Sequence, residues 1–222
     1  MNHMAAAVNW LVCFAVNEEA AFFRRSRRRD PEVVITGMGR RNAVEAVQRA
    51  MAAHQPRRVI TAGFAGGLAP DLLRGTVVFD QDDELRLETT LRSMGAVPAK
   101  FHCARRVAVT ASDKTNLRNK TGADVVEMES SVIRSLCRDA GIPSATIRVI
   151  SDAAADDLPL DFNALMTPSD RINWLKFAAT IARRPGLIFR LIEFQRQTRE
   201  AAKELARVLE QVIRTPSSGE LS

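Results

Sequence analysis

Short apolar runs alternate with segments of helical periodicity over the first 152 residues. Runs rich in β-branched residues predict strands at residues 8–16, 32–37, 58–62, 76–79, 106–109, 123–126 and 144–150. Apolar positions at helical spacing predict helices at residues 42–54 and 130–140, and Gly141 and Pro143 are typical of the end of the second helix. This order predicts an α/β fold with three layers, in which a mixed, mostly parallel central sheet is flanked by helices.

Long amphipathic helices follow from residue 170 onward. Apolar positions at helical spacing predict one helix over about 171–183 and a second over 187–214, with a break at Pro185-Gly186. These helices are expected to pack on the domain or on a partner subunit. We therefore divide the chain into a main domain at residues 1–169, a long C-terminal helical appendage of the same domain at 170–215, and a flexible tail at 216–222.

Composition is that of a globular chain without a membrane span. No apolar run approaches the roughly 20 residues needed to cross a bilayer, and the apolar N-terminal stretch runs into Glu18 and Glu19, which favours a buried strand over a signal peptide. The cysteines Cys13, Cys103 and Cys137 are odd in number and far apart, which favours neither a disulfide framework nor a zinc site. We expect a cytoplasmic protein with no bound metal.

The net charge of +6 raises the question of nucleic-acid binding. The densest basic cluster, RRSRRR at residues 24–29, lies between two apolar runs, and the chain has no Tyr that could stack on bases. A solvated surface that attracts anions is the better interpretation, so no nucleic-acid partner is expected.

Three short stretches fall at the ends of predicted strands, where ligands bind in open α/β sheets. In TAGFAGGLAP, residues 61–70, the glycines permit close approach of the backbone to a ligand, although an ordinary glycine turn is the alternative. In VVEMESSVI, residues 125–133, Glu129 could accept hydrogen bonds from the vicinal hydroxyls of a ribose, with Met128 as an adaptable apolar neighbour. The alternative is that Glu129 only favours the start of the following helix.

The third stretch is IRVISDAAADD at residues 147–157, where Ser151 and Asp152 end an apolar strand. A partly desolvated carboxyl group there can stay protonated near neutral pH and donate to a leaving group. The alternative is an Asx turn that closes the strand.

Taken together and in this order, these stretches resemble the nucleoside phosphorylase and nucleosidase superfamily, which includes the methylthioadenosine/S-adenosylhomocysteine nucleosidases. The resemblance covers residues 8–157, through VITGMGRRNAVEA, TAGFAGGLAPDLLRGTVVF, GADVVEMESSVI and IRVISDAAAD. The short middle section TASDKTNLRNKTGADVVEMES and the RRPG break are similar to the bacterial hopanoid-associated phosphorylases. The main domain is then a nucleoside phosphorylase-like or nucleosidase-like catalytic domain.

The resemblance implies cleavage of the N-ribosidic bond of a purine, adenosine-type nucleoside. Asp152 would be the general acid that protonates purine N7, oriented by Ser151. Glu129 would bind the ribose hydroxyls beside Met128. The family's water-activating glutamate corresponds to Glu18 in FAVNEEAAFF, and the neighbouring Glu19 is the alternative.

Other positions of the family's site are carried over less directly. Ala65 and Gly66 would line the sugar side of the site. The family's aromatic position, which stacks on the base, falls on Val107, and Cys103-Ala104-Arg105 replaces the family's Ser-Gly-Asp pattern. Recognition of the base is therefore expected to differ from the family's pattern.

Hydrolysis and phosphorolysis differ in the nucleophile that attacks C1′. Phosphorolytic relatives bind phosphate with an early Gly-Asp-Pro loop, whereas this chain has Val16-Asn17-Glu18, whose carboxylate would repel phosphate. We expect hydrolysis without a cofactor. The first alternative is phosphorolysis with inorganic phosphate as co-substrate, for which Arg40, Arg41 or residues 24–29 would be the ligands. The second is a catalytically silent nucleoside-binding protein.

Two further expectations concern partners. The apolar stripes of the C-terminal helices and the resemblance favour a homodimer. Basic residues interleaved with apolar ones around the RRPG break would also suit peripheral contact with an anionic membrane, and hence a nucleoside with a polycyclic lipid tail, as the hopanoid-associated relatives imply.

Overall fold

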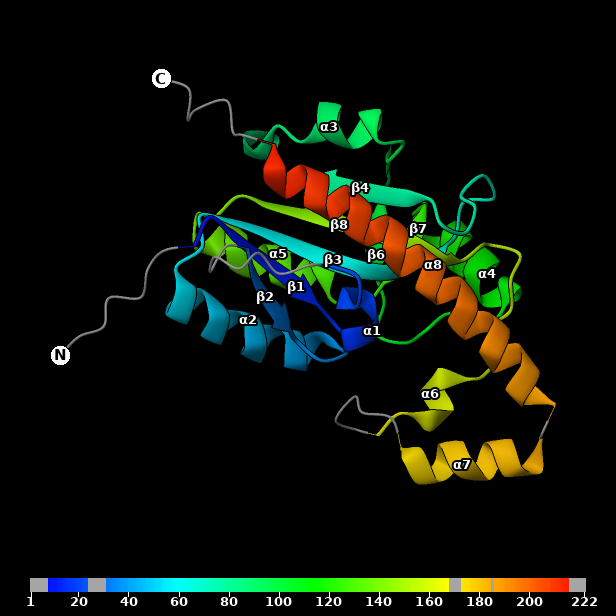
Figure 1. Cartoon of the computed structure of the whole chain (residues 1–222). Helices are drawn as coiled ribbons and strands as arrows, with labels where there is room; N and C mark the ends of the chain where they lie inside the picture. The colour runs from blue at the N-terminus through cyan, green and yellow to red at the C-terminus, as the bar shows by residue number, and fades with distance from the viewer. Residues whose placement is uncertain (1–7, 24–30, 168–172, 185, 216–222) are drawn as a thin grey trace, which may run out of the picture.

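The structure is a computed structural model that describes residues 8–23, 31–167, 173–184 and 186–215. An eight-stranded sheet lies between helices (Figure 1). The strands are β1 (Trp10–Phe14), β2 (Glu32–Ile35), β3 (Arg58–Gly67), β4 (Val77–Gln81), β5 (Val97–Pro98), β6 (Phe101–Cys103), β7 (Val125–Glu127) and β8 (Ser144–Asp152). The helices are α1 (Asn17–Ala20), α2 (Arg40–His54), α3 (Glu88–Ser93), α4 (Ala111–Thr121), α5 (Ser130–Asp139), α6 (Phe162–Leu165), α7 (Trp174–Arg183) and α8 (Leu187–Arg214), with a 3₁₀ turn at Asp83–Leu85.

The sheet is mixed and mostly parallel, as predicted. Its main path runs β2-β1-β3-β8-β4-β5, and only β4 within that path is antiparallel to its neighbour β8. The short strand β7 pairs antiparallel with the end of β3 and parallel with β6. The central strand β8 is buried along its whole length, including its polar residues Thr146, Arg148 and Asp152.

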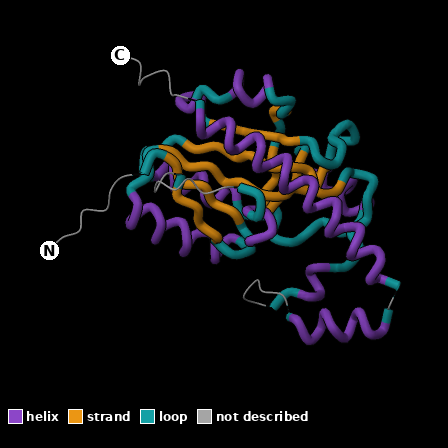
Figure 2. Tube along the Cα trace, in the orientation of Figure 1, coloured by secondary structure: helices purple, strands orange, loops and turns teal. Residues whose placement is uncertain are grey.

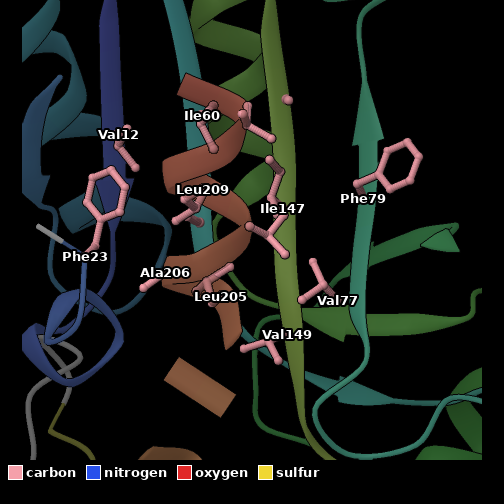
Figure 3. Close-up of a cluster of buried hydrophobic side chains, with 14 of the residues drawn as sticks. Val12, Phe23, Ile60, Val77, Phe79, Ile147, Val149, Leu205, Ala206 and Leu209 are labelled. Carbon is pink, nitrogen blue, oxygen red and sulfur yellow. The ribbon is translucent and has the colours of Figure 1, made fainter. Parts of the chain in front are cut away.

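Helices cover both faces of the sheet and give the predicted three layers. On one face α8 crosses the strands, and its Leu205 and Leu209 pack with Val12, Ile60 and Ile147 (Figure 3). On the other face α2 and α5 pack on the neighbouring strand positions; this cluster includes Leu11, Val59, Val47, Ile133 and Cys137. The two faces use alternate residues of β1 and β3 because side chains alternate across a strand.

The long C-terminal helix predicted from the sequence is present, and its C-terminal half packs on the domain as part of the core. Its buried side chains are Ala201, Ala202, Leu205, Ala206, Val208, Leu209 and Val212. The N-terminal half of α8 extends past the sheet toward α6 and α7 (Figures 1 and 2). The predicted bounds of α8 are confirmed.

The predicted strand at residues 106–109 is wrong. These residues form a loop, because their backbone bonds to other segments: Asn163 contacts both the N–H and the carbonyl of Val107, and Leu158 donates to Val109. Helix α4 was not predicted. The boundary at residues 169/170, the basic cluster at 24–29 and the tail at 216–222 lie outside the described residues. Across the described ranges, no helix is both long and apolar enough to span a membrane.

Candidate active site

A cavity of about 230 Å³ lies where the carboxyl ends of β1, β3 and β8 meet the segment that follows β7. This edge of the sheet is the usual ligand site of an open α/β fold. Seven of the residues predicted for the site, together with the alternative residue Glu19, line this one cavity: Ala65, Gly66, Val107, Met128, Glu129, Ser151 and Asp152.

Glu18 is the one predicted site residue outside the cavity. Its side chain is exposed on α1, whereas the neighbouring Glu19 is buried, lines the cavity and is only 6% exposed. The two residues follow one another on a single helical turn, so they point in different directions. The prediction that Glu18 lies in the site is therefore wrong, and the alternative residue, Glu19, lies there.

The carboxylate of Glu19 is held by backbone donors from two segments. Its Oε2 accepts hydrogen bonds from the N–H groups of Ala15 at 2.8 Å and Val16 at 3.2 Å, and its Oε1 accepts one from Phe64 at 2.8 Å. Burial raises the pKa of Glu19, although Arg148 and these hydrogen bonds oppose the shift. A carboxylate with a raised pKa is a stronger base once ionised.

Gly63 allows Glu19 and Arg148 to approach the backbone of β3. A Cβ at this position would lie 2.7 Å from Arg148 Nη1 and closer still to the Glu19 carboxyl. The φ of Gly63, +155°, is also one that other residues rarely adopt. The first glycine of TAGFAGG is thus required by the charged groups of the site, and the alternative of an ordinary turn does not apply because Gly63 lies within β3.

Arg148 is a buried cation beside Glu19, Glu127 and Glu129, and it was not predicted from the sequence. It is 2% exposed, and its Nη2 donates to Glu127 Oε2 at 2.9 Å and to Thr61 Oγ1 at 3.0 Å. Burial alone would raise the pKa of Glu127, but Arg148 and hydrogen bonds from Ser130 outweigh it, and the pKa is lowered. Glu127 is therefore an ionised partner of Arg148.

Glu129 has a different environment from Glu127. Its Oε1 accepts a hydrogen bond from Gly39 N at 2.8 Å, at the start of α2, and its side chain makes no capping bond to α5. Glu127 takes that capping position instead, accepting from the N–H of Ser130 at 2.8 Å. Glu129 does stand at the start of α5, as that alternative has it, but the carboxylate that bonds to the helix N-terminus is that of Glu127. Within the described residues Oε2 of Glu129 accepts no hydrogen bond, so it has capacity for a ligand.

The pKa of Glu129 is raised to about 7. Burial is the largest cause, and the negative charges of Glu127 and Glu19 add to it, while Arg148 opposes it. Glu129 therefore titrates near neutral pH.

Each carboxylate oxygen of Asp152 has a partner in the protein, a hydrogen bond at one oxygen and an ion pair at the other. Ser151 Oγ donates to Oδ1 at 2.6 Å, and Lys114 Nζ lies 2.5 Å from Oδ2. Among the described residues Asp152 accepts no backbone hydrogen bond of the kind that forms an Asx turn, and in the segment after β8 it is Asp156 whose Oδ2 accepts from Ala153 N. Ser151 orients Asp152 as predicted from the family, and Lys114 adds a cation that no pattern in the sequence indicated.

The wall near Val107 is held by α6. Asn163 accepts a hydrogen bond from Val107 N and donates one to Val107 O, both at 2.9 Å. Phe162 and Phe194 also line the cavity, with ring centroids 6.2 Å apart. Aromatic side chains therefore reach the cavity from α6 and α8, although the position that carries the family's aromatic residue is Val107.

The missed residues differ in the signal that could have revealed them. A charged residue within the apolar strand IRVIS must be paired when buried, so Arg148 could have been singled out. Phe162, Phe194 and Lys114 reach the site only through tertiary packing. In the part of the chain that the structure describes, no group of three or more His, Cys, Asp or Glu side chains is arranged to hold a metal ion.

The chain is similar to known proteins in sequence and in fold. The 5'-methylthioadenosine/S-adenosylhomocysteine nucleosidase of Shewanella pealeana is 26% identical over 168 residues, which are 60% of this chain and 73% of that protein. The S-adenosylhomocysteine nucleosidase of Streptococcus pyogenes superposes with a TM-score of 0.67 at 16% identity, covering 95% of this chain and 98% of that one. The futalosine hydrolase of Helicobacter pylori superposes with a TM-score of 0.64 at 16% identity, covering 96% and 99%.

A family model described as the phosphorylase superfamily matches residues 20–91 and 96–214. The predicted fold class and the predicted enzyme class, a nucleosidase or nucleoside phosphorylase, are confirmed at the level of the family. With most of its length matched by that model, this chain belongs to the phosphorylase superfamily.

Proposed function

We propose that this protein hydrolyses the N-ribosidic bond of a purine, adenosine-type nucleoside. The observation that carries the proposal is the convergence of Glu19, Glu129 and Asp152 on one cavity, each with a different set of partners. A binding protein would need a clamp for the ribose, but it would not need both an acid and a base. The names of the relatives in the comparisons, nucleosidase and hydrolase, support the same chemistry.

The proposed reaction divides the work among these carboxyl groups. Asp152 gives a proton to N7 of the purine as the C1′–N9 bond breaks, so the base leaves as a neutral molecule. Glu129 accepts hydrogen bonds from the ribose hydroxyls beside Met128. Glu19 takes a proton from the water that attacks C1′, and the developing positive charge of the sugar is stabilised by the surrounding carboxylates.

Electrostatics favour water over phosphate as the nucleophile. Glu19, Glu127 and Glu129 surround the buried cation Arg148, which is already paired with Glu127, and the other buried cation of the described residues, Lys114, is paired with Asp152. A phosphate dianion would be repelled by these carboxylates. Arg40 and Arg41, considered above as phosphate ligands, are exposed and do not line the cavity, and residues 24–29 lie outside the described residues.

The apolar wall suggests the class of the group attached beyond the ribose. Leu158, Phe162 and Phe194 line the cavity, and Phe189 nearby on α8 is 78% exposed. We propose an apolar substituent, such as the lipid tail implied by the resemblance to hopanoid-associated proteins. We also propose a cytoplasmic homodimer, which static light scattering would test against the 24.5 kDa mass of one chain.

The decisive experiment is to incubate the purified protein with adenosine-type nucleosides, with and without phosphate, and to follow the free base by chromatography. We expect release of the base and of ribose without phosphate. Asp152→Asn should lower kcat by at least about 10²-fold, the low end for loss of a general acid. A strict requirement for phosphate would establish phosphorolysis, and no release from any nucleoside would favour a silent binding protein.

A further inference from the structure

Helix α4 has one buried side chain, and it is a lysine. The helix spans Ala111–Thr121, and its only buried residue is Lys114, with 0% exposure. The rest of the helix is mostly polar, and Leu117 is its one side chain that packs, partly buried, against a hydrophobic cluster. Lysine is almost never fully buried unless it is paired, and the partner here is the Asp152 carboxyl.

The Lys114 ammonium group has three oxygen acceptors within reach, two joined by hydrogen bonds and the third by an ion pair. Nζ donates to the carbonyl of Ala153 at 2.7 Å and to that of Asp156 at 2.9 Å, and lies 2.5 Å from Asp152 Oδ2. Two of these acceptors are neutral carbonyls in the segment after β8, so they fix the position of the amine without taking its proton. Asp152 is the one acceptor that could take that proton.

Lys114 does not line the cavity, whereas Asp152 does. Oδ2, the oxygen next to Lys114, lies on the side of Gly66, where an added Cβ would be 3.3 Å from it. The carboxyl group therefore lies between the ammonium group and the space that a nucleoside would occupy.

We infer that Lys114 is a positioning residue that supplies, through Asp152, the proton that the leaving base receives. This inference rests on the proposed function. A hydrogen on Nζ moves to the Asp152 carboxylate, and the carboxyl gives a proton to N7 as the C1′–N9 bond breaks. The pair then holds a neutral amine and a carboxylate, and one proton from solvent restores the ammonium group. The proton of the attacking water goes separately to Glu19.

Other charged groups around the pair affect its pH dependence. Asp156 faces Lys114. Burial would raise the pKa of Asp156, but the hydrogen bonds that it accepts from Arg74 and Ala153 outweigh burial, and the pKa is lowered. Across the cavity, Glu129 titrates near pH 7 and lies close to Arg148. A pH profile of one substrate would therefore mix several titrations, and a reference substrate is needed.

The test compares two substrates whose leaving groups differ in their need for a proton. A purine nucleoside needs protonation at N7, whereas p-nitrophenyl β-D-riboside releases an anion that needs none. Lys114→Met should lower kcat on the nucleoside by about 10- to 100-fold at pH 8, which is at most the low end of the effect of a general acid because Asp152 itself is retained. The loss should shrink as pH falls, because solvent then supplies protons more readily, and kcat on the p-nitrophenyl riboside should stay within about twofold.

Two further variants keep the test decisive. Lys120→Met makes the same change at an exposed position of α4 and should retain wild-type kinetics. Lys114→Arg keeps the positive charge but removes the transferable proton, because a guanidinium does not deprotonate in proteins. It should lose activity on the nucleoside only. If Lys114→Met fails to fold, Lys114→Met combined with Asp152→Asn avoids the unpaired charge, and its kcat should equal that of Asp152→Asn alone.

Equal losses on both substrates, or a loss that is the same at every pH, would show that Lys114 is only structural and would overturn the inference. So would unchanged kcat in Lys114→Met while Asp152→Asn is impaired; that outcome leaves the proposed function intact. A wild-type protein that releases no base from any nucleoside would overturn both.

Discussion

At the scale of single residues, each carboxyl group of the cavity has its own electrostatic environment. Glu127 pairs with Arg148 and has a lowered pKa, whereas burial dominates at Glu129 and Glu19 and raises theirs. Of these three carboxyl groups, Glu127 is thus an ionised structural partner, whereas Glu129 and Glu19 can change protonation state. Such separation is typical of sites that use an acid and a base at one pH.

The neighbours Glu18 and Glu19 provide a matched pair for testing the base. Glu19→Gln should lower kcat by about 10²-fold or more, because the amide cannot take a proton from water. Glu18→Gln makes the same change on an exposed side chain and should stay close to wild type. Steady-state kinetics with a purine nucleoside checks both variants; a large loss in Glu18→Gln alone would return the role to Glu18.

The raised pKa of Glu129 makes stability depend on pH. Its folded-state pKa is about 7 against an ordinary value of 4.5. The folded state therefore binds the proton more tightly, and the stabilisation is fully present below pH 4.5 and is lost as pH rises through 7. Between pH 5 and 8 the free energy of unfolding of wild type should fall by up to about 3 kcal/mol relative to Glu129→Gln.

Urea unfolding of both proteins at several pH values measures this difference. Glu129→Gln is the reference because it removes the titration and retains the other charged groups of the cavity. A difference between the two proteins that does not change with pH would show that Glu129 titrates at its ordinary pKa.

Sequence patterns located most of the cavity because its residues follow strand ends. Met128, Glu129, Ser151 and Asp152 lie where the strand order and the glycine-rich stretch predicted them. The choice between Glu18 and Glu19 depended on the orientation of a four-residue helix, α1, which a pattern in the sequence does not fix. Lys114 could not be found, because a lysine in a polar helix is ordinarily exposed.

At the scale of elements, one short helix supports a loop that a strand was predicted to occupy. Residues 106–109 have β-branched character, but their backbone groups bond to Asn163 on α6 and to Leu158 instead of to a strand. Tertiary hydrogen bonds thus overrode the local preference. The central strands and the long helices were predictable because their apolar periodicity is extended, which α6 and the two-residue strand β5 lack.

Asn163→Ala should loosen this wall of the cavity. The change removes both hydrogen bonds to Val107 and leaves its half-buried N–H without that partner. We expect KM for a nucleoside to rise several-fold with a smaller change in kcat, because the wall shapes the site but carries none of the proposed proton transfers. Asn163→Asp keeps the acceptor for Val107 N, so its KM should lie between those of wild type and Asn163→Ala. A loss of kcat without a rise in KM would contradict the role of this loop as a wall of the cavity.

At the scale of the whole molecule, four of the six large apolar side chains that are exposed among the described residues lie on α7 and the N-terminal half of α8. Leu175 is 84% exposed, Phe189 78% and Ile192 58%, and the basic residues Arg183, Arg184 and Arg190 are exposed among them. Apolar groups beside positive charge match the surface of an anionic membrane, where each basic residue contributes about 1 kcal/mol.

Co-sedimentation with anionic vesicles tests this surface. Wild type should bind at low salt and dissociate at high salt, and Arg183→Glu with Arg184→Glu should weaken binding. The same charge change at Arg41 and Arg49, exposed on α2 at the opposite face of the sheet, is the control and should have little effect. Absence of binding at low salt, together with a dimeric mass, would assign these apolar side chains to a subunit interface instead.

Helix α8 is buried along only its C-terminal half, so its N-terminal half should open to solvent more easily than its C-terminal half. Residues 201–212 supply all of its buried side chains, whereas none in 187–200 is buried, although Phe194 in that half lines the cavity. Amide hydrogens should therefore exchange with solvent deuterium slowest around Leu205 and Leu209, at the rate of global unfolding, and much faster near Phe189. A nucleoside bound against Phe194 would slow exchange in the free half only, so deuterium uptake along one helix would report occupancy of the cavity.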